Sequence, residues 1–236
     1  MLRRDNGSSV PPARFPMPDR MPDPRAAALQ SPGEEIANSI SHGLGLGLSA
    51  AALPVLLVHA HGAAATVGAA LFGATALLLY LSSTLYHAIS RPSAKAVLRW
   101  LDHASIYLFI AGTYTPFTLT VLRGAWGWTL FGLVWGLAAL GLLFKAMGPA
   151  RFPRLSTLLY LAMGWIVLIA IVPLWHALPA AGLAWLFAGG AAYTLGVIFF
   201  SIDERVPYAH FVWHLFVLAG TVCHFIAVLL CAGGRA

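Results

Sequence analysis

The feature that most constrains this chain is a series of seven apolar stretches, each about 20 residues long, which is the length needed to cross roughly 30 Å of hydrocarbon as a helix. Charged residues make up only 9% of the sequence, against about 25% in soluble domains. We therefore predict an all-α membrane protein, a single bundle of seven transmembrane helices. The expected helices cover residues 37–58, 65–89, 98–121, 126–146, 156–176, 180–200 and 209–231.

The chain before the first helix differs in composition from the rest. Residues 1–31 are rich in Pro and Arg, contain no apolar stretch and lack the hydrophobic region of a signal peptide. Such a segment buries too little apolar surface to fold alone. We expect a disordered cytoplasmic tail at 1–31 and a transmembrane domain at 32–236. Ser31, Pro32 and Glu34 have the spacing of a capping box, which predicts that the first helix begins there.

The net charge of +6 is distributed unevenly between the two ends of the predicted bundle. When the loops are assigned to alternate sides, twelve of the 14 Lys and Arg residues fall on the side of the N-terminus, and only Arg123 and Arg235 fall on the other. By the positive-inside rule, the N-terminus is cytoplasmic and the C-terminus is outside. The basic charge thus reflects membrane topology and does not indicate a nucleic-acid partner.

Four ionisable residues fall at similar depth near the predicted cytoplasmic ends of three helices: His87, Asp102, His210 and His214. At 1.5 Å per residue, the first three lie roughly 4–8 Å inside the membrane boundary, and His214 lies about one turn deeper. Ionisable groups inside a bilayer are costly, so each is a candidate for a functional site.

The chemistry that these residues suggest is metal binding. His210 and His214 are four residues apart and share one helix face, and His87 from another helix could complete a set of three imidazoles. Zinc accepts such a set and leaves one position for water, although imidazole also suits other divalent ions. Asp102 could hydrogen-bond that water or act as its general base. Ser83, one turn before His87, could orient a ligand or contact a substrate.

The alternative for these histidines is structural, because imidazoles also hydrogen-bond between membrane helices or lie among lipid headgroups. His42 is either a neighbour of the metal site or a packing residue. His103 is expected to point away from Asp102 and take no part. His224 is too far from His214 to share a metal, and we expect it to form an interhelical hydrogen bond.

Three other features are expected to be structural. Cys223 and Cys231 lie eight residues apart on one helix, about 12 Å along its axis, which is too far for a disulfide. Pro116 and Pro173 fall inside predicted helices and should distort them. The acidic and basic residues at 203–205 are expected to form a solvated loop.

Four motifs in this order resemble the hemolysin III family: EExxNxxxHG before the first helix, SxxxH in SSTLYH, LDH at the start of the third helix and HxxxH in HFVWH. The resemblance implies that His87, His210 and His214 bind zinc, and that Asp102 contacts the zinc through water. It also matches Ser83 to the serine of the family motif.

The resemblance covers residues 33–231 and extends to a group that includes the progestin and adipoQ receptors and the alkaline ceramidases. It implies a multi-pass protein of the bacterial inner membrane with its N-terminus inside. The ceramidase relatives suggest zinc-dependent hydrolysis of a lipid amide or ester, with a membrane lipid as substrate. The family name instead implies cytolysis.

Three functions therefore remain open. In a hydrolase, a cavity beside the metal should admit a lipid, whereas in a receptor-like regulator the metal would be structural and enclosed. A cytolytic pore would need a hydrated path through the bundle, and the fourth and fifth apolar stretches offer few polar groups for one.

Overall fold

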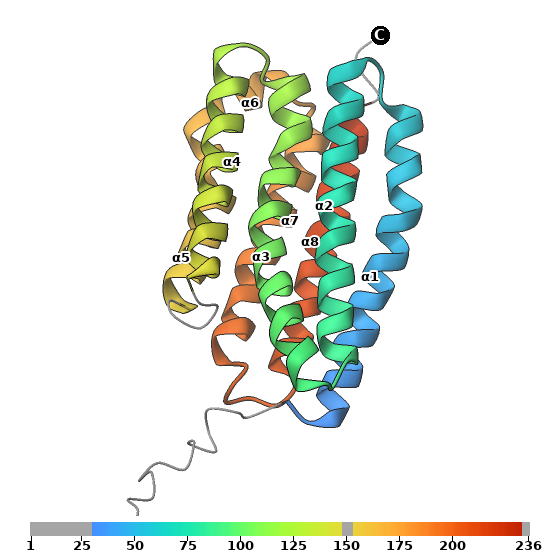
Figure 1. Ribbon diagram of the computed structural model, residues 1–236. Helices are drawn as coiled ribbons and strands as arrows, with labels where there is room; N and C mark the ends of the chain where they lie inside the picture. The colour runs from blue at the N-terminus through green and yellow to red at the C-terminus, as the bar shows by residue number, and fades with distance from the viewer. Residues whose placement is uncertain (1–29, 148–152, 233–236) are drawn as a thin grey trace, which may run out of the picture.

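The computed structural model describes residues 30–147 and 153–232, and it forms a bundle of long helices (Figure 1). The expected tail lies almost wholly outside the described residues, as do Arg151 and Arg235. The helices are α1 (Pro32–His59), α2 (Ala63–Ala88), α3 (Pro92–Pro116), α4 (Ala125–Ala146), α5 (Pro153–Trp165), α6 (Ile171–Ala177), α7 (Ala180–Ile202) and α8 (Ala209–Ala232).

Seven segments of the described chain are long and apolar enough to cross a membrane, which confirms the predicted bundle. The fifth segment, Arg154–Ala177, is not one continuous α-helix but consists of α5, a 3₁₀ turn at Ile166–Ala170 and α6. Pro173 has no N–H to donate to the carbonyl of Ile169, so the break falls where proline removes a helical hydrogen bond. After Pro116, α3 likewise changes into a π-helical turn at Phe117–Val121.

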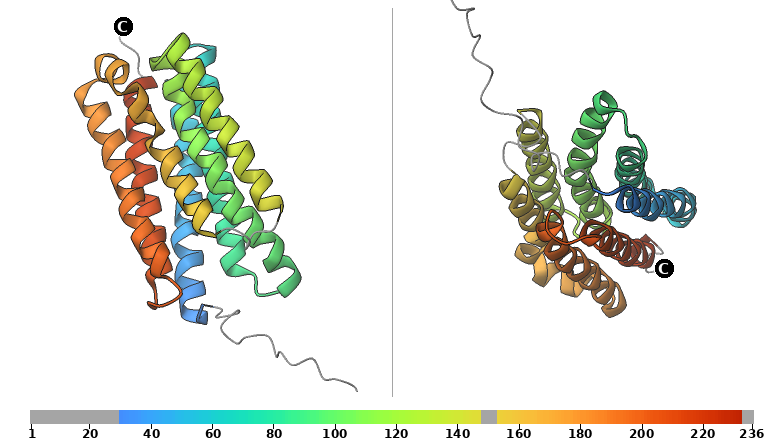
Figure 2. Two further views of the ribbon diagram at one scale, coloured as in Figure 1. Left: turned by 90° about the vertical axis from the view of Figure 1, so that its left-hand side faces the viewer. Right: turned by 90° about the horizontal axis from the view of Figure 1, so that it is seen from below.

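Membrane segments that are adjacent in sequence lie side by side, and α8 packs against both α7 and α1, so that the bundle closes into a ring (Figure 2). Glycines permit the closest approaches. A Cβ at Gly189 of α7 would meet the ring of His224, and one at Gly45 of α1 would meet the ring of Tyr80. Small residues at membrane helix contacts allow this kind of packing.

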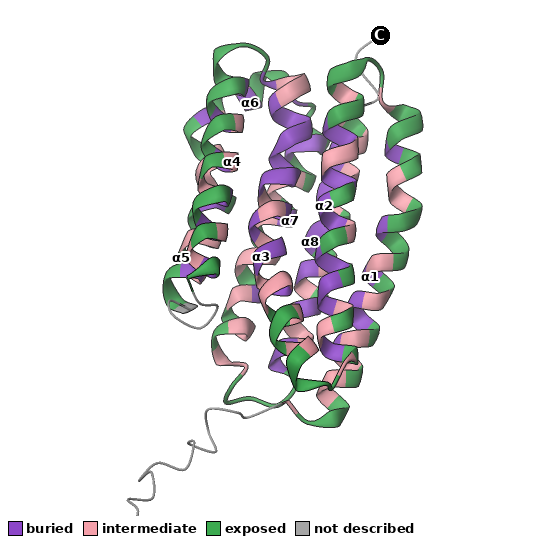
Figure 3. Ribbon diagram, in the orientation of Figure 1, coloured by how far each residue is buried: buried purple, intermediate pink, exposed green. Residues whose placement is uncertain are grey.

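Burial divides the bundle into an inner and an outer surface (Figure 3). Tyr80, Tyr107 and Leu130 are fully enclosed in the core. Large apolar side chains such as Val58 (77% exposed) and Leu143 (63%) face outward. An apolar exterior around the whole bundle is what contact with lipid requires.

The start of α1 is fixed by the predicted capping box. The Ser31 hydroxyl accepts a hydrogen bond from the Glu34 N–H at 3.3 Å, and the Glu34 carboxylate accepts one from the Ser31 N–H at 2.9 Å. Glu34 also accepts a hydrogen bond from the N–H of Tyr208, just before α8, at 2.7 Å. These contacts place the beginnings of α1 and α8 together at one end of the bundle.

Candidate metal centre

Three histidines meet at that end of the bundle: His87 from the last turn of α2, and His210 and His214 from the first turns of α8. Each offers one nitrogen, and these three atoms lie within 4.8 Å of one another. All three residues are buried, with exposed fractions of 4%, 9% and 1%. We call them the three-histidine group.

Each histidine of the group uses Nδ1 to bond an oxygen from elsewhere in the chain. Nδ1 of His87 lies 2.7 Å from Oε2 of Glu35, and Nδ1 of His210 lies 2.7 Å from Oδ2 of Asp203. A carboxylate oxygen only accepts hydrogen bonds, so Nδ1 carries the hydrogen in both rings. Their Nε2 atoms are therefore free to accept a metal.

His214 is held in the same way from α1. Its Nδ1 lies 3.3 Å from the carbonyl oxygen of Asn38 and 3.1 Å from Oγ of Ser41. Because a carbonyl oxygen only accepts, Nδ1 of His214 is again a donor and Nε2 is the bare nitrogen. An outer oxygen that fixes the tautomer of each ligand is typical of histidine metal sites.

The donor set fits a metal ion. Nε2 of His87 is buried and has no hydrogen-bond partner among the described residues, a costly state unless a further group binds it. In a tetrahedral zinc site, nitrogens that each lie about 2.0–2.1 Å from the ion are roughly 3.3–3.4 Å apart. The observed spread of up to 4.8 Å exceeds this by about 1.4 Å, so the imidazoles would close on the ion by side-chain rotation.

The other two predicted site residues lie close by but outside the group. Ser83 is buried one turn before His87, and its hydroxyl has no hydrogen-bond partner among the described residues. Asp102, on α3, is 9% exposed and lines the same cavity as His210 and His214. It supplies no atom to the three-histidine group.

The inner cavity runs along the bundle from the three-histidine group and has a volume of about 140 Å³. Its near end is lined by Asp102, His210 and His214, and its far part by side chains such as Leu130 and Leu174. Beyond the metal centre, most of the side chains that line the cavity are apolar.

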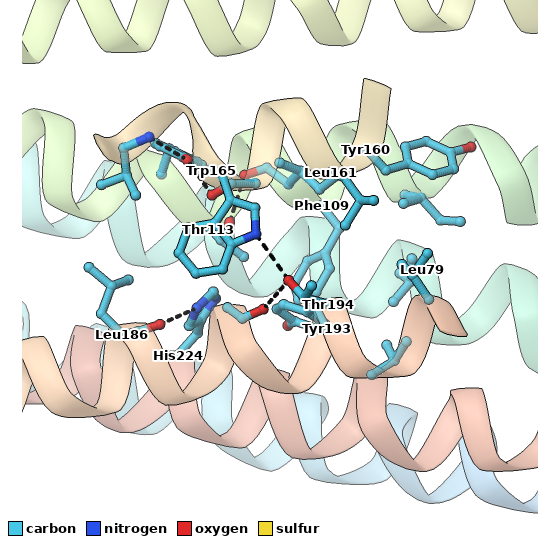
Figure 4. Close-up of a pocket in the computed structure, with 18 of the residues that line it drawn as sticks. Leu79, Phe109, Thr113, Tyr160, Leu161, Trp165, Leu186, Tyr193, Thr194 and His224 are labelled. Atoms are coloured by element: carbon cyan, nitrogen blue, oxygen red, sulfur yellow. Dashed lines mark hydrogen bonds between the residues drawn. The ribbon is translucent and has the colours of Figure 1, made fainter. Parts of the chain in front are cut away.

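Polar groups in the middle of the inner cavity bond to the bundle itself (Figure 4). Nε1 of Trp165 donates to Oγ1 of Thr194 at 3.0 Å. Nε2 of His224 lies 3.2 Å from the carbonyl oxygen of Leu186, which is the interhelical bond predicted for that histidine. The cavity therefore presents mainly apolar surface beyond the metal centre.

Two predictions from the sequence need correction or completion. Asp203 was expected to be solvated, which is wrong, because it is half-buried and bonds His210. His42 proves to be a neighbour of the site, since its ring stacks on that of His214 with centroids 3.5 Å apart. Cys223 and Cys231 are free thiols, as predicted.

Sequence reasoning assigned no role to Glu35, Asn38 or Ser41, although the first two belong to the EExxNxxxHG motif. A signal was present, because Glu35, Asn38 and His42 recur at intervals of three and four residues. That spacing places them on one face of α1. The partners they face on α2 and α8 could not be read from α1 alone.

Comparison with known proteins points to one family. A family model described as "Haemolysin-III related" matches residues 31–225. Hemolysin-3 of Bacillus cereus is 49% identical over 199 residues, covering 83% of this chain and 90% of that protein. The hemolysin-3 homolog of Bacillus subtilis (strain 168) is 48% identical over 199 residues, covering 83% and 93%.

A more distant relative is the human monocyte to macrophage differentiation factor, which is 29% identical over 165 residues and covers 67% of each chain. The family match spans every helix of the bundle up to residue 225 in α8, and it includes the three-histidine group. The chain therefore belongs to the haemolysin-III family, a membership that the four motifs in its sequence predict.

Proposed function

We propose that this protein is a zinc-dependent membrane hydrolase that cleaves an acyl amide or ester bond of a lipid. The observation that carries the proposal is the shared orientation of the three histidines. All three use Nδ1 as a donor to an oxygen and leave Nε2 bare. Histidines that served only to hydrogen-bond neighbouring helices would not be expected to leave three converging Nε2 atoms without a partner.

His87, His210 and His214 would hold the zinc ion. When bound, zinc polarises a carbonyl group and lowers the pKa of a water ligand toward about 7. Residues of the chain would transfer the proton and orient the substrate. Asp102 would accept a proton from the attacking water and return it to the leaving amine or alkoxide, and Ser83 would hydrogen-bond the substrate or the attacking water.

The inner cavity supports the choice of a lipid substrate. It begins at Asp102, His210 and His214 and continues among apolar side chains, so an acyl chain could lie in it with its carbonyl at the metal centre. The same lining disfavours a pore, which would need a hydrated path. A purely structural metal would not explain why a buried carboxylate borders the cavity at the metal.

The distribution of basic residues supports a site on the cytoplasmic side. The end of the bundle with the metal centre carries basic residues just before α3 and α8, at the end of α4 and at the start of α5, namely Arg91, Arg205, Lys145 and Arg154, whereas Arg123 lies at the opposite end. We propose a bacterial inner-membrane protein with the N-terminus in the cytoplasm and the C-terminus outside.

The first test is the metal content of purified protein in chelator-free buffer. We expect about one zinc ion per chain in the wild type, loss of the metal in His214→Ala and no change in His61→Ala, which alters an exposed histidine. Hydrolysis of lipid amides should then fall at least a hundredfold in Asp102→Asn. Metal-free wild-type protein, or full activity in Asp102→Asn, would rule out the mechanism.

A further inference from the structure

A second hollow lies on the outside of the bundle, between α1, the end of α2 and the start of α3. This outer groove has a volume of about 800 Å³. Glu35 and His87 line it, so it reaches the metal centre at the one histidine of the group that does not line the inner cavity. The metal centre thus has one apolar approach inside the bundle and one approach from its surface.

One wall of the outer groove is basic. Lys95 and Arg99 line it and are four residues apart on α3, so their side chains share a helix face. The ammonium group of Lys95 lies 2.5 Å from Oε1 of Glu35, which neutralises one charge. Arg99 is exposed and forms no hydrogen bond or ion pair with another described residue. Its guanidinium group is therefore available to an anion.

The opposite wall is apolar. Ile36 and Ile40 of α1 line the groove and are 61% and 67% exposed. They are four residues apart and form a strip on the lipid-facing surface of the helix. A groove with one basic and one apolar wall, placed where a helix enters the membrane, matches an anionic lipid better than a soluble anion.

We propose that the outer groove binds the phosphate headgroup of an anionic lipid, and that the substrates of the hydrolase are acyl lipids with such a headgroup. Arg99 would contact the phosphate, Lys95 would offset the negative charge of Glu35 that also lines the groove, and Ile36 and Ile40 would pack on the glycerol and upper chain. The scissile carbonyl would then lie at the three-histidine group, with its acyl chain in the inner cavity. The substrate assignment rests on the proposed function, whereas the binding itself does not.

The test is lipid retention by the full-length, detergent-purified protein. Protein incubated with equimolar phosphatidylglycerol and phosphatidylcholine is examined by native mass spectrometry. We expect the wild type to retain phosphatidylglycerol preferentially. In Arg99→Gln the ratio of bound phosphatidylglycerol to bound phosphatidylcholine should fall roughly fivefold, which is the contribution of one basic residue near a membrane surface. Arg99→Glu should invert the preference.

Two matched substitutions control for charge alone. Arg205→Gln removes an exposed basic residue at the same end of the bundle but outside the groove, and Arg123→Gln removes one at the opposite end. Both should keep the wild-type ratio. An equal loss in Arg205→Gln, an unchanged ratio in Arg99→Gln, or displacement of the lipid by inorganic phosphate would overturn the proposal.

Measuring the metal content of the same samples distinguishes a failure of the lipid-binding proposal from a failure of the hydrolase proposal. Zinc-free wild-type protein that still prefers phosphatidylglycerol would contradict the hydrolase and support the groove as a lipid site. Zinc-loaded protein with no lipid preference would contradict the groove and leave the hydrolase standing.

Discussion

Glu35 offers the sharpest test of how the metal centre is organised. Its carboxylate bridges two groups, with one oxygen 2.7 Å from Nδ1 of His87 and the other 2.5 Å from Nζ of Lys95. The substitution Glu35→Gln keeps the length and shape of the side chain but removes its charge. It also leaves only one oxygen, which cannot accept both hydrogen bonds in the same geometry.

The size of the expected loss in zinc affinity follows from the position of Glu35 beside a metal ligand. Loss of such an outer partner typically lowers metal affinity 10- to 100-fold, or about 1.4–2.8 kcal/mol. The Glu35 side chain is 18% exposed, so water can replace part of the lost interaction. We therefore expect the lower end of the range, about a tenfold weaker zinc affinity.

The assay is competition for zinc between the purified protein and a fluorescent chelator. Glu34→Gln is the matched control, because Glu34 hydrogen-bonds Ser31 and the backbone of Tyr208 but no histidine of the group. Zinc affinity should fall in Glu35→Gln and stay unchanged in Glu34→Gln. Equal affinities for Glu35→Gln and the wild type would refute the assignment of Glu35 as the residue that orients His87.

Two further predictions concern the bundle. Gly189→Ala should destabilise the protein by about 1–3 kcal/mol, because the added Cβ would collide with the ring of His224. A lower Tm in detergent would show this loss of stability. Gly136→Ala is the control and should not lower the Tm, because a Cβ there meets nothing within 4 Å. In a cysteine-free background, a membrane-impermeant maleimide should label Arg123→Cys in intact cells but Arg205→Cys only after permeabilisation, and the reverse pattern would exclude a cytoplasmic N-terminus.

The seven spans were predictable from the sequence because a bilayer imposes a local requirement. Each span must satisfy its backbone hydrogen bonds within itself and expose about 20 apolar residues to lipid. The start of α1 was equally local, since Ser31 and Glu34 lie within one turn of each other. The break in the fifth span was visible only as Pro173; its 3₁₀ geometry depends on how α5 and α6 pack.

The candidate site was predictable where its residues belong to one helix. His210 and His214 share a face of α8 through their spacing alone. The depth of His87 and Asp102 was also set by position along a helix. Depth, however, does not determine which way a side chain faces, so the sequence could not establish that these residues approach α8.

By itself, then, the sequence determined a seven-helix membrane protein with histidines at one end of the bundle and motifs of one family. Only the tertiary structure decided that His87 joins His210 and His214, and that Glu35, Asn38 and Asp203 fix their ring nitrogens. The tertiary structure also determined the position of the inner cavity and of the outer groove. The physical reason is that helix formation depends on neighbours along the chain, whereas a metal site and a cavity depend on the rotation and packing of helices far apart in sequence.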